Sequence, residues 1–361
     1  MASTTHTMKL LFVVILLNAK SIFAFTPLNR RTATYSSVTS SVSSRFSTLI
    51  PSNGVNTEPL STAPSAVNKD SGRVAVLVCP AQFCVPDDYK VLFENIAALA
   101  INDPSLARIG TCRVAPLPRT EWIKVARSLP TGAFLEARLP VSSTLKWYFD
   151  AIEDGLADIF ATEGTDVNIC LVGHSIGGWV ARAYLGGLSH SSTAVSRLAA
   201  VRCTSLITLG TPHTSPADAL VDQTRGLLRE IAESPACRSQ ALADRGIDVT
   251  CVCSSSLGGS FFTTNVEELV AASAYLPLLG RIDSSVRGDG IVPLDLAFME
   301  SPACRIVLDT CSITNEKIRH CHVLPTPWNL LDGYAPSIGL PDSFPSYVSN
   351  GVVQQWIRHV Q

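Results

Sequence analysis

The residues best suited to chemistry lie at positions 173–178, where the sequence is Gly-His-Ser-Ile-Gly-Gly. They follow an apolar run at 168–172 and precede a helical pattern over 176–185. A serine on such a sharp strand-to-helix turn is exposed as a nucleophile, and flanking glycines let the backbone crowd together. Because an ordinary glycine-rich turn has the same composition, the strand and the helix on either side are what favour Ser175 as a nucleophile. The amide of Ile176 would open the helix, where it could stabilise an oxyanion.

A serine nucleophile of this kind needs a carboxylate and then a histidine further along the chain. Asp289 lies in the turn Gly-Asp-Gly-Ile-Val-Pro at 288–293, which would present a single carboxylate. An Asp-Gly pair also occurs in plain turns. Spacing alone therefore leaves Asp283, Asp295 and Asp309 open as alternatives.

Three histidines follow Asp289 in the sequence: His320, His322 and His359. His359 ends the last amphipathic helix and is expected at the surface. His320 and His322 are two residues apart, so on extended backbone both would point to the same side. A His-x-His pair can also bind metal, but no third ligand is nearby. We therefore expect no metal and no organic cofactor, and the spacing keeps both histidines open as the base.

Strand and helix patterns alternate through residues 73–361, which predicts one α/β domain with a mostly parallel sheet flanked by helices. Strands are expected at 74–79, 113–117, 168–172, 206–209, 249–252 and 305–308. Helices are expected at 88–99, 144–160 and 176–185. Residues 217–284 interrupt this alternation with helical patterns at 217–231 and 266–274 around one strand. Part of this stretch is expected to form a cap over the site.

Composition narrows the function classes. The 361 residues carry a net charge of −2, and only 16% are charged while 46% are hydrophobic. No basic stripe with interleaved aromatic residues is present, which argues against a nucleic-acid partner. The eleven cysteines are odd in number and scattered, without the paired C-x-x-C spacing of a zinc site. Several lie inside apolar runs, so we expect buried, reduced thiols.

Three segments resemble lipase-like α/β-hydrolases: 173–178, the run Ile-Thr-Leu-Gly-Thr-Pro-His at 207–213, and 288–293. The similarity is greatest to chloroplast-type plant and algal members, and more remote to the inositol-deacylase and lipase group. It extends over most of 73–361 and includes 119–123 and 145–148. It implies the α/β-hydrolase fold.

The same resemblance assigns roles to single residues. It implies Asp289 as the triad acid. It favours His320 as the base because a small residue follows it, with His322 as the alternative. The amide of Gln82 would complete the oxyanion hole with Ile176, although the family's glycine is replaced by Ala81. His213 is expected to be structural.

These features predict a serine hydrolase that cleaves carboxylic, lipid-like esters through an acyl-enzyme. The same triad would serve an acyltransferase, and the scaffold alone would serve a non-catalytic binding protein. Residues 258–279 are rich in apolar side chains, which suit a core or the wall of a lipid-binding cap. The expected partner is a small-molecule or lipid ester. A peripheral membrane contact and the oligomeric state stay open.

The first 72 residues have the character of a leader. Residues 1–24 combine Lys9, a short apolar run and a small residue at Ala24, as in a signal peptide. Residues 25–72 begin rich in Ser, Thr and Arg, with no acidic residue before Glu58, as in a disordered transit segment. The Ala24–Phe25 junction resembles the cleavage motif of algae with complex plastids. We expect a plastid location, with secretion as the alternative.

A fusion of residues 1–60 to a fluorescent protein tests the leader. We expect fluorescence in the plastid, because a signal peptide followed by an acid-free segment is typical of a two-part plastid leader. Fluorescence microscopy with a plastid marker provides the measurement. Signal confined to the medium or the endoplasmic reticulum would contradict the prediction.

Overall fold

The computed structural model describes residues 72–122, 124, 138–215, 224–281, 283–324 and 333–361. The expected signal peptide (1–24) lies outside these residues, as does the transit segment (25–72) apart from Gly72. The first part of the expected cap, 217–223, also lies outside them.

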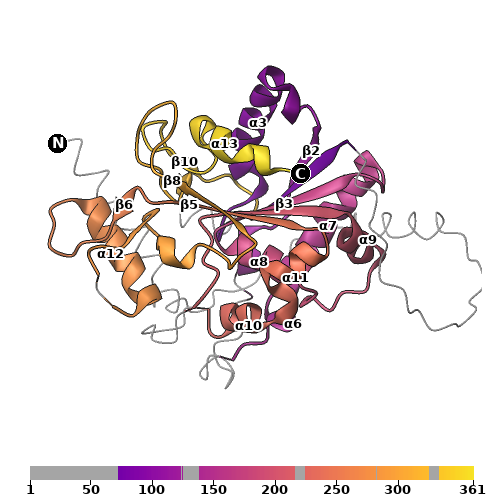
Figure 1. Ribbon diagram of the computed structural model, residues 1–361, viewed down its shortest axis with the longest axis horizontal. Helices are drawn as coiled ribbons and strands as arrows, with labels where there is room; N and C mark the ends of the chain where they lie inside the picture. The colour runs from indigo at the N-terminus through magenta and orange to yellow at the C-terminus, as the bar shows by residue number, and fades with distance from the viewer. Residues whose placement is uncertain (1–71, 123, 125–137, 216–223, 282, 325–332) are drawn as a thin grey trace, which may run out of the picture. The chain divides into compact units, whose positions relative to one another are not determined.

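A six-stranded parallel sheet forms the centre of the fold (Figure 1). Its strand order is β2-β1-β3-β4-β5-β8, and every neighbouring pair is parallel. The strands are β1 (Val74–Cys79), β2 (Ile109–Val114), β3 (Asn168–His174), β4 (Cys203–Leu209), β5 (Asp248–Ser254) and β8 (Cys304–Leu308). The prediction of a parallel α/β sheet is confirmed, and its central strands are buried on both faces, as their continuous apolar runs require.

Helices cover both faces of this sheet. Figure 1 shows α3 (Lys90–Asn102) and α13 (Asn350–Trp356) above it and α8 (Ile176–Leu185) below it. Side chains alternate between the faces, so Val76 packs with the α3 and α13 side while Leu77 packs with the other. The second layer also contains α6 (Val141–Thr144), α7 (Lys146–Glu163), α9 (Ala194–Arg202), α10 (Leu227–Glu233) and α11 (Ser239–Asp244).

Helix α12 (Val266–Leu279) lies outside the two covering layers. It is bracketed by two short antiparallel strands, β6 (Leu257–Gly258) and β7 (Arg287–Gly288). Within the expected cap region, the strand predicted at 249–252 is β5 of the main sheet, so α12, with β6 before it, is the part that departs from the α/β alternation. Its role as a cap stays a prediction. A further pair, β9 (Val323–Leu324) and β10 (Ile338–Gly339), follows near the C-terminus.

Short 3₁₀ turns connect these elements: η2 (Pro86–Tyr89), η3 (Pro104–Leu106), η4 (Arg119–Trp122), η5 (Pro235–Cys237), η6 (Leu294–Leu296) and η8 (Ile357–His359).

Two expected elements are displaced. The strand predicted at 113–117 is β2 at Ile109–Val114, because Pro116 has no N–H with which to continue the ladder. The helix predicted at 217–231 begins, in its described part, only at Leu227. Arg225 and Gly226 before it have φ angles of 52° and 97°, which are not helical. Helix α9 was missed because its apolar residues do not form one buried side: Ala199 is its only buried residue.

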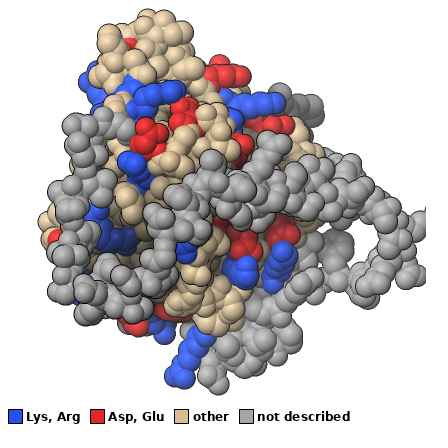
Figure 2. Space-filling view, turned by 90° about the vertical axis from the view of Figure 1, so that its right-hand side faces the viewer, with Lys and Arg blue, Asp and Glu red and all other residues tan. Residues whose placement is uncertain are grey.

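The described surface carries mixed charge. On the face shown in Figure 2, Lys and Arg are interspersed with Asp and Glu and do not gather into one basic stripe. Eight of the eleven cysteines are buried, as expected from the apolar runs that contain them. Within the described part of the chain, no helix is long and apolar enough to cross a membrane.

Candidate active site

Ser175 occupies the turn between β3 and α8. Its backbone has φ 55° and ψ −125°, a conformation that non-glycine residues rarely adopt. Such strain persists only where the surroundings enforce it, and it is concentrated at functional sites. Here the Ser175 amide donates to the Leu209 carbonyl at the end of β4, at 2.9 Å. The turn is therefore anchored to the neighbouring strand.

The three glycines of the motif are required by close backbone packing. A Cβ on Gly173 would lie 2.2 Å from Gly178 Cα. On Gly177 it would lie 2.0 Å from the Cys79 carbonyl oxygen, at the end of β1, and on Gly178 it would lie 2.1 Å from Thr211 Oγ1. The glycines thus allow the first turn of α8 to approach the carboxyl ends of two strands.

Asp289 and His320 form a buried pair. His320 Nδ1 donates to Asp289 Oδ2 at 2.8 Å, since a carboxylate can only accept. The other carboxylate oxygen accepts the amides of Ile291 and Val292, at 3.0 and 2.7 Å. The His320 amide also donates to the Asp289 carbonyl, at 3.0 Å. This tautomer leaves Nε2 of His320 without its proton and able to accept one.

Tyr347 is a third partner of this carboxylate, which the sequence did not indicate. Its hydroxyl donates to Asp289 Oδ2 at 2.7 Å and accepts the Ser254 amide at 3.1 Å. Burial, and then the nearby Asp289 carboxylate, raise the pKa of Tyr347 well above its ordinary value, so it remains a donor. Each Asp289 oxygen therefore has two donors, and its orientation is fixed.

The serine turn and the acid–base pair meet at the end of β4. Leu209 accepts from the Ser175 amide, and Gly210 follows directly. A Cβ on Gly210 would lie 2.4 Å from Asp289 Oδ2 and 2.9 Å from His320 Nδ1. Leu209 therefore contacts the Ser175 turn, and the next residue, Gly210, contacts the pair of Asp289 and His320.

The loop after β1 supplies the second backbone segment of the site. Residues 81–84 form a turn in which the Cys84 amide donates to the Ala81 carbonyl at 3.0 Å. Phe83 in this turn has a positive φ of 63°. The amides of Gln82 and Ile176 have no acceptor among the described residues. The loop is held by Tyr148, whose hydroxyl donates to the Pro80 carbonyl at 2.6 Å.

The remaining candidates lie apart from this pair. His322 is buried, and its Nε2 donates to the Asp88 carbonyl at 2.9 Å; burial lowers its pKa to about 4. His213 is buried, and its Nε2 lies 3.0 Å from Thr208 Oγ1. Burial lowers the pKa of His213 well below the usual value. Among the alternative acids, Asp283 bonds Ser285 at 2.5 Å, and Asp309 bonds Ser255. The structure brings His320, rather than His322, to Asp289.

Residues 148–216, which include the Ser175 turn, match the family model described as "Putative serine esterase (DUF676)". The matched residues contain the strand–serine–helix turn between β3 and α8. No curated protein matches this chain.

A comparison with solved structures matches this chain to Aspergillus fumigatus lipase B. The identity is 11%, the match covers 83% of this chain and 65% of that chain, and the TM-score is 0.38. A second match is a metagenomic carboxyl esterase. The identity is 12%, the match covers 85% of this chain and 81% of that chain, and the TM-score is 0.35.

Replacing Gly177 by alanine tests the packing of the Ser175 turn. The methyl group would meet the Cys79 carbonyl at 2.0 Å, so α8 must move away from β1. We expect a loss of about 1–3 kcal/mol in the free energy of unfolding and a lower hydrolytic rate. Urea unfolding and hydrolysis of a p-nitrophenyl ester provide the measurements.

Gly339→Ala is the matched control, because a Cβ there meets nothing within 4 Å. Equal stability and activity of both variants would contradict the packing argument.

Proposed function

We propose that this protein hydrolyses carboxylic esters through an acyl-enzyme, with Ser175 as nucleophile, His320 as base and Asp289 as the acid that orients it. The observation that carries the proposal is the 2.8 Å bond from His320 Nδ1 to Asp289 Oδ2, beside the strained Ser175 turn. Fixing Nδ1 as the protonated nitrogen prepares Nε2 to accept the serine proton.

Each step then assigns a role to one group. His320 Nε2 takes the hydroxyl proton as Ser175 Oγ attacks the ester carbonyl carbon. The oxyanion is bound by the free amides of Gln82 and Ile176, the latter at a helix N-terminus. The carbon–oxygen bond to the alcohol breaks as Nε2 returns the proton to the leaving oxygen. Water, activated by the same nitrogen, then releases the acid and restores Ser175. Asp289 stabilises the imidazolium formed in both halves.

Acyl transfer would use the same first half, with an alcohol in place of water in the second. A non-catalytic binding protein would need none of this arrangement. The buried donors on Asp289 and the strained backbone of Ser175 favour catalysis over binding, because both are costly to maintain without a chemical role.

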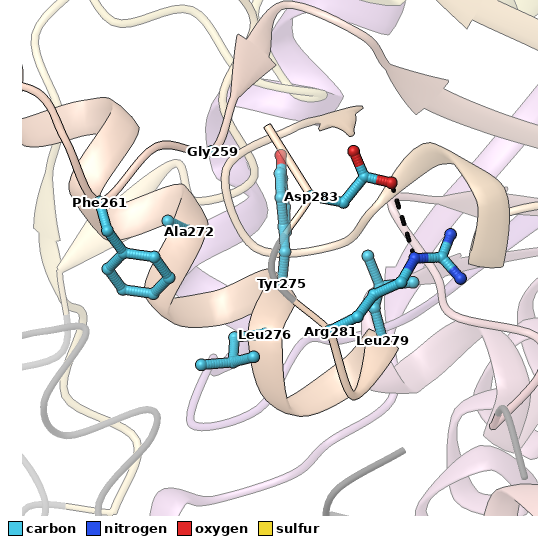
Figure 3. Close-up of a pocket in the computed structure, with 8 residues that line it drawn as sticks. All are labelled: Gly259, Phe261, Ala272, Tyr275, Leu276, Leu279, Arg281 and Asp283. Carbon is cyan, nitrogen blue, oxygen red and sulfur yellow. Dashed lines mark ion pairs between the residues drawn. The ribbon is translucent and has the colours of Figure 1, made fainter. Parts of the chain in front are cut away.

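The substrate is proposed to be lipid-like. Helix α12 is joined to the turn of the acid, since the Gly290 amide donates to Tyr275 Oη at 2.9 Å. Leu276 and Leu279 of the same helix line a small pocket together with Phe261, which lies before the helix (Figure 3). Phe262 beside it is 98% exposed and could contact a lipid surface. These side chains would favour long acyl groups over acetate.

The leader completes the proposal. We propose that residues 1–24 and the transit segment direct the enzyme to a plastid, where its buried thiols would remain reduced.

Substitutions in the triad test the mechanism. Ser175→Ala and His320→Ala should each lower kcat by about a million-fold, because triad members act as a unit. His322→Asn should retain most activity, since His322 bonds Asp88 and not Asp289. Steady-state hydrolysis of p-nitrophenyl butyrate provides the measurement. An active Ser175→Ala variant would reject the nucleophile, and an inactive His322→Asn with an active His320→Ala would move the base to His322.

Acyl-chain preference tests the substrate class. We expect kcat/KM to rise from p-nitrophenyl acetate to the octanoate, because α12 offers an apolar wall. Leu276→Glu should lower kcat/KM for the octanoate about tenfold or more and leave the acetate nearly unchanged. Ile101→Glu is the control, since Ile101 is exposed on α3. Faster turnover of acetate than of octanoate by the wild type would contradict a lipid-like substrate.

A further inference from the structure

Three buried hydrogen bonds connect the loop after β1 to the backbone of His320. The Ala81 amide, next to Gln82, lies 2.8 Å from Tyr89 Oη. Tyr89 Oη lies 3.0 Å from His174 Nδ1. His174 Nε2 lies 3.0 Å from the His320 carbonyl oxygen. The chain of contacts thus joins three segments that are distant in sequence: the loop after β1, the end of β3 and the loop of His320.

Donor and acceptor chemistry assigns every proton in this chain. The His320 carbonyl can only accept, so His174 Nε2 carries a proton. Burial, and then His320 and His322, lower the pKa of His174 well below its usual value, so the ring is neutral and Nδ1 can only accept. Tyr89 Oη therefore donates to His174 Nδ1 and accepts from the Ala81 amide.

A second connection runs alongside the first. His322 donates to the carbonyl of Asp88, the residue before Tyr89. The Asp88 side chain is itself held by the Val85 amide at 2.9 Å and by buried Arg119 at 3.2 Å. The segment that carries Tyr89 is thus rigidly fixed, so the contacts it makes define where the loop after β1 and the loop of His320 lie relative to each other.

We propose that Tyr89 and His174 are positioning residues that set the distance between the oxyanion-binding amide of Gln82 and the base His320. The inference rests on the proposed function, since it assigns roles to groups that act through Gln82 and His320. Neither side chain contacts the substrate in this account. They hold the loop after β1 and the loop of His320 in place, and groups from both loops must act on the same tetrahedral carbon.

This role predicts a defect in the transition state and not in substrate binding. Oxyanion contacts form fully only as the carbonyl becomes tetrahedral. A displacement of about 1 Å in such a site can cost about a hundredfold in rate. Removing the Tyr89 hydroxyl leaves the Ala81 amide and His174 Nδ1 without their partners, so the loop after β1 loses its anchor.

Tyr89→Phe is the direct test, because the ring remains to fill the buried space. We expect kcat for p-nitrophenyl butyrate to fall about 10- to 100-fold while KM changes less than threefold. The affinity for a trifluoromethyl ketone, which forms a tetrahedral adduct with serine, should fall in parallel with kcat/KM. Tyr184→Phe is the matched control: Tyr184 is also buried, and its hydroxyl has no partner in the described structure.

His174→Asn provides a second variant at the other end of the same contact. Because both substitutions break one chain, the double variant should be no slower than the slower single variant. Thermal unfolding of each variant shows whether it is folded at the assay temperature.

The outcomes separate this inference from the proposed function. If Tyr89→Phe and His174→Asn are folded and retain kcat within threefold while Ser175→Ala is inactive, the positioning role is wrong and the triad stands. A rise in KM alone, or losses that multiply in the double variant, would also overturn it. An active Ser175→Ala would instead reject the proposed function.

Discussion

The close approach of helix α8 to the carboxyl ends of β1 and β4 is the constraint on which the site depends. It is possible only because Gly177 and Gly178 have no side chains to separate the helix from Cys79 and Thr211. It forces Ser175 into a strained conformation and brings the helix N-terminus beside the loop after β1. The proposed nucleophile and both proposed oxyanion-binding amides are therefore positioned by the same packing contact.

The second requirement is that buried polar groups find partners. Asp289 lies in the interior, where an unpaired carboxylate would be very costly. Two amides, His320 and Tyr347 satisfy it. His174 and Tyr89 are satisfied in the same manner, and Asp88 is paired with Arg119. Because these partners come from several loops, satisfying them also fixes the loops in place.

The sequence predicted the parts of this arrangement that are local. The Ser175 turn follows from a buried strand, a glycine-flanked serine and a helix within about twenty residues, and the parallel sheet follows from the alternation of patterns. Spacing alone left several aspartates and two histidines open, and only the resemblance to known hydrolases favoured Asp289 and His320.

The supporting residues could not be found this way. Tyr347 lies 58 residues from Asp289, and Tyr89 lies 85 residues from His174. Hydrophobic periodicity reports which side of an element is buried, and a buried tyrosine has the same pattern whether or not its hydroxyl reaches a partner. The one local signal was the replacement of the family's glycine by Ala81.

The central claim is that Ser175 is a nucleophile activated by His320. Mass spectrometry of peptides from the protein treated with a fluorophosphonate tests it most directly, because the reagent bonds only to an activated serine oxygen. We expect a single adduct on Ser175 in the wild type and a labelling rate that falls by orders of magnitude in His320→Ala. An unlabelled Ser175, or labelling that is unaffected by the loss of His320, would contradict it.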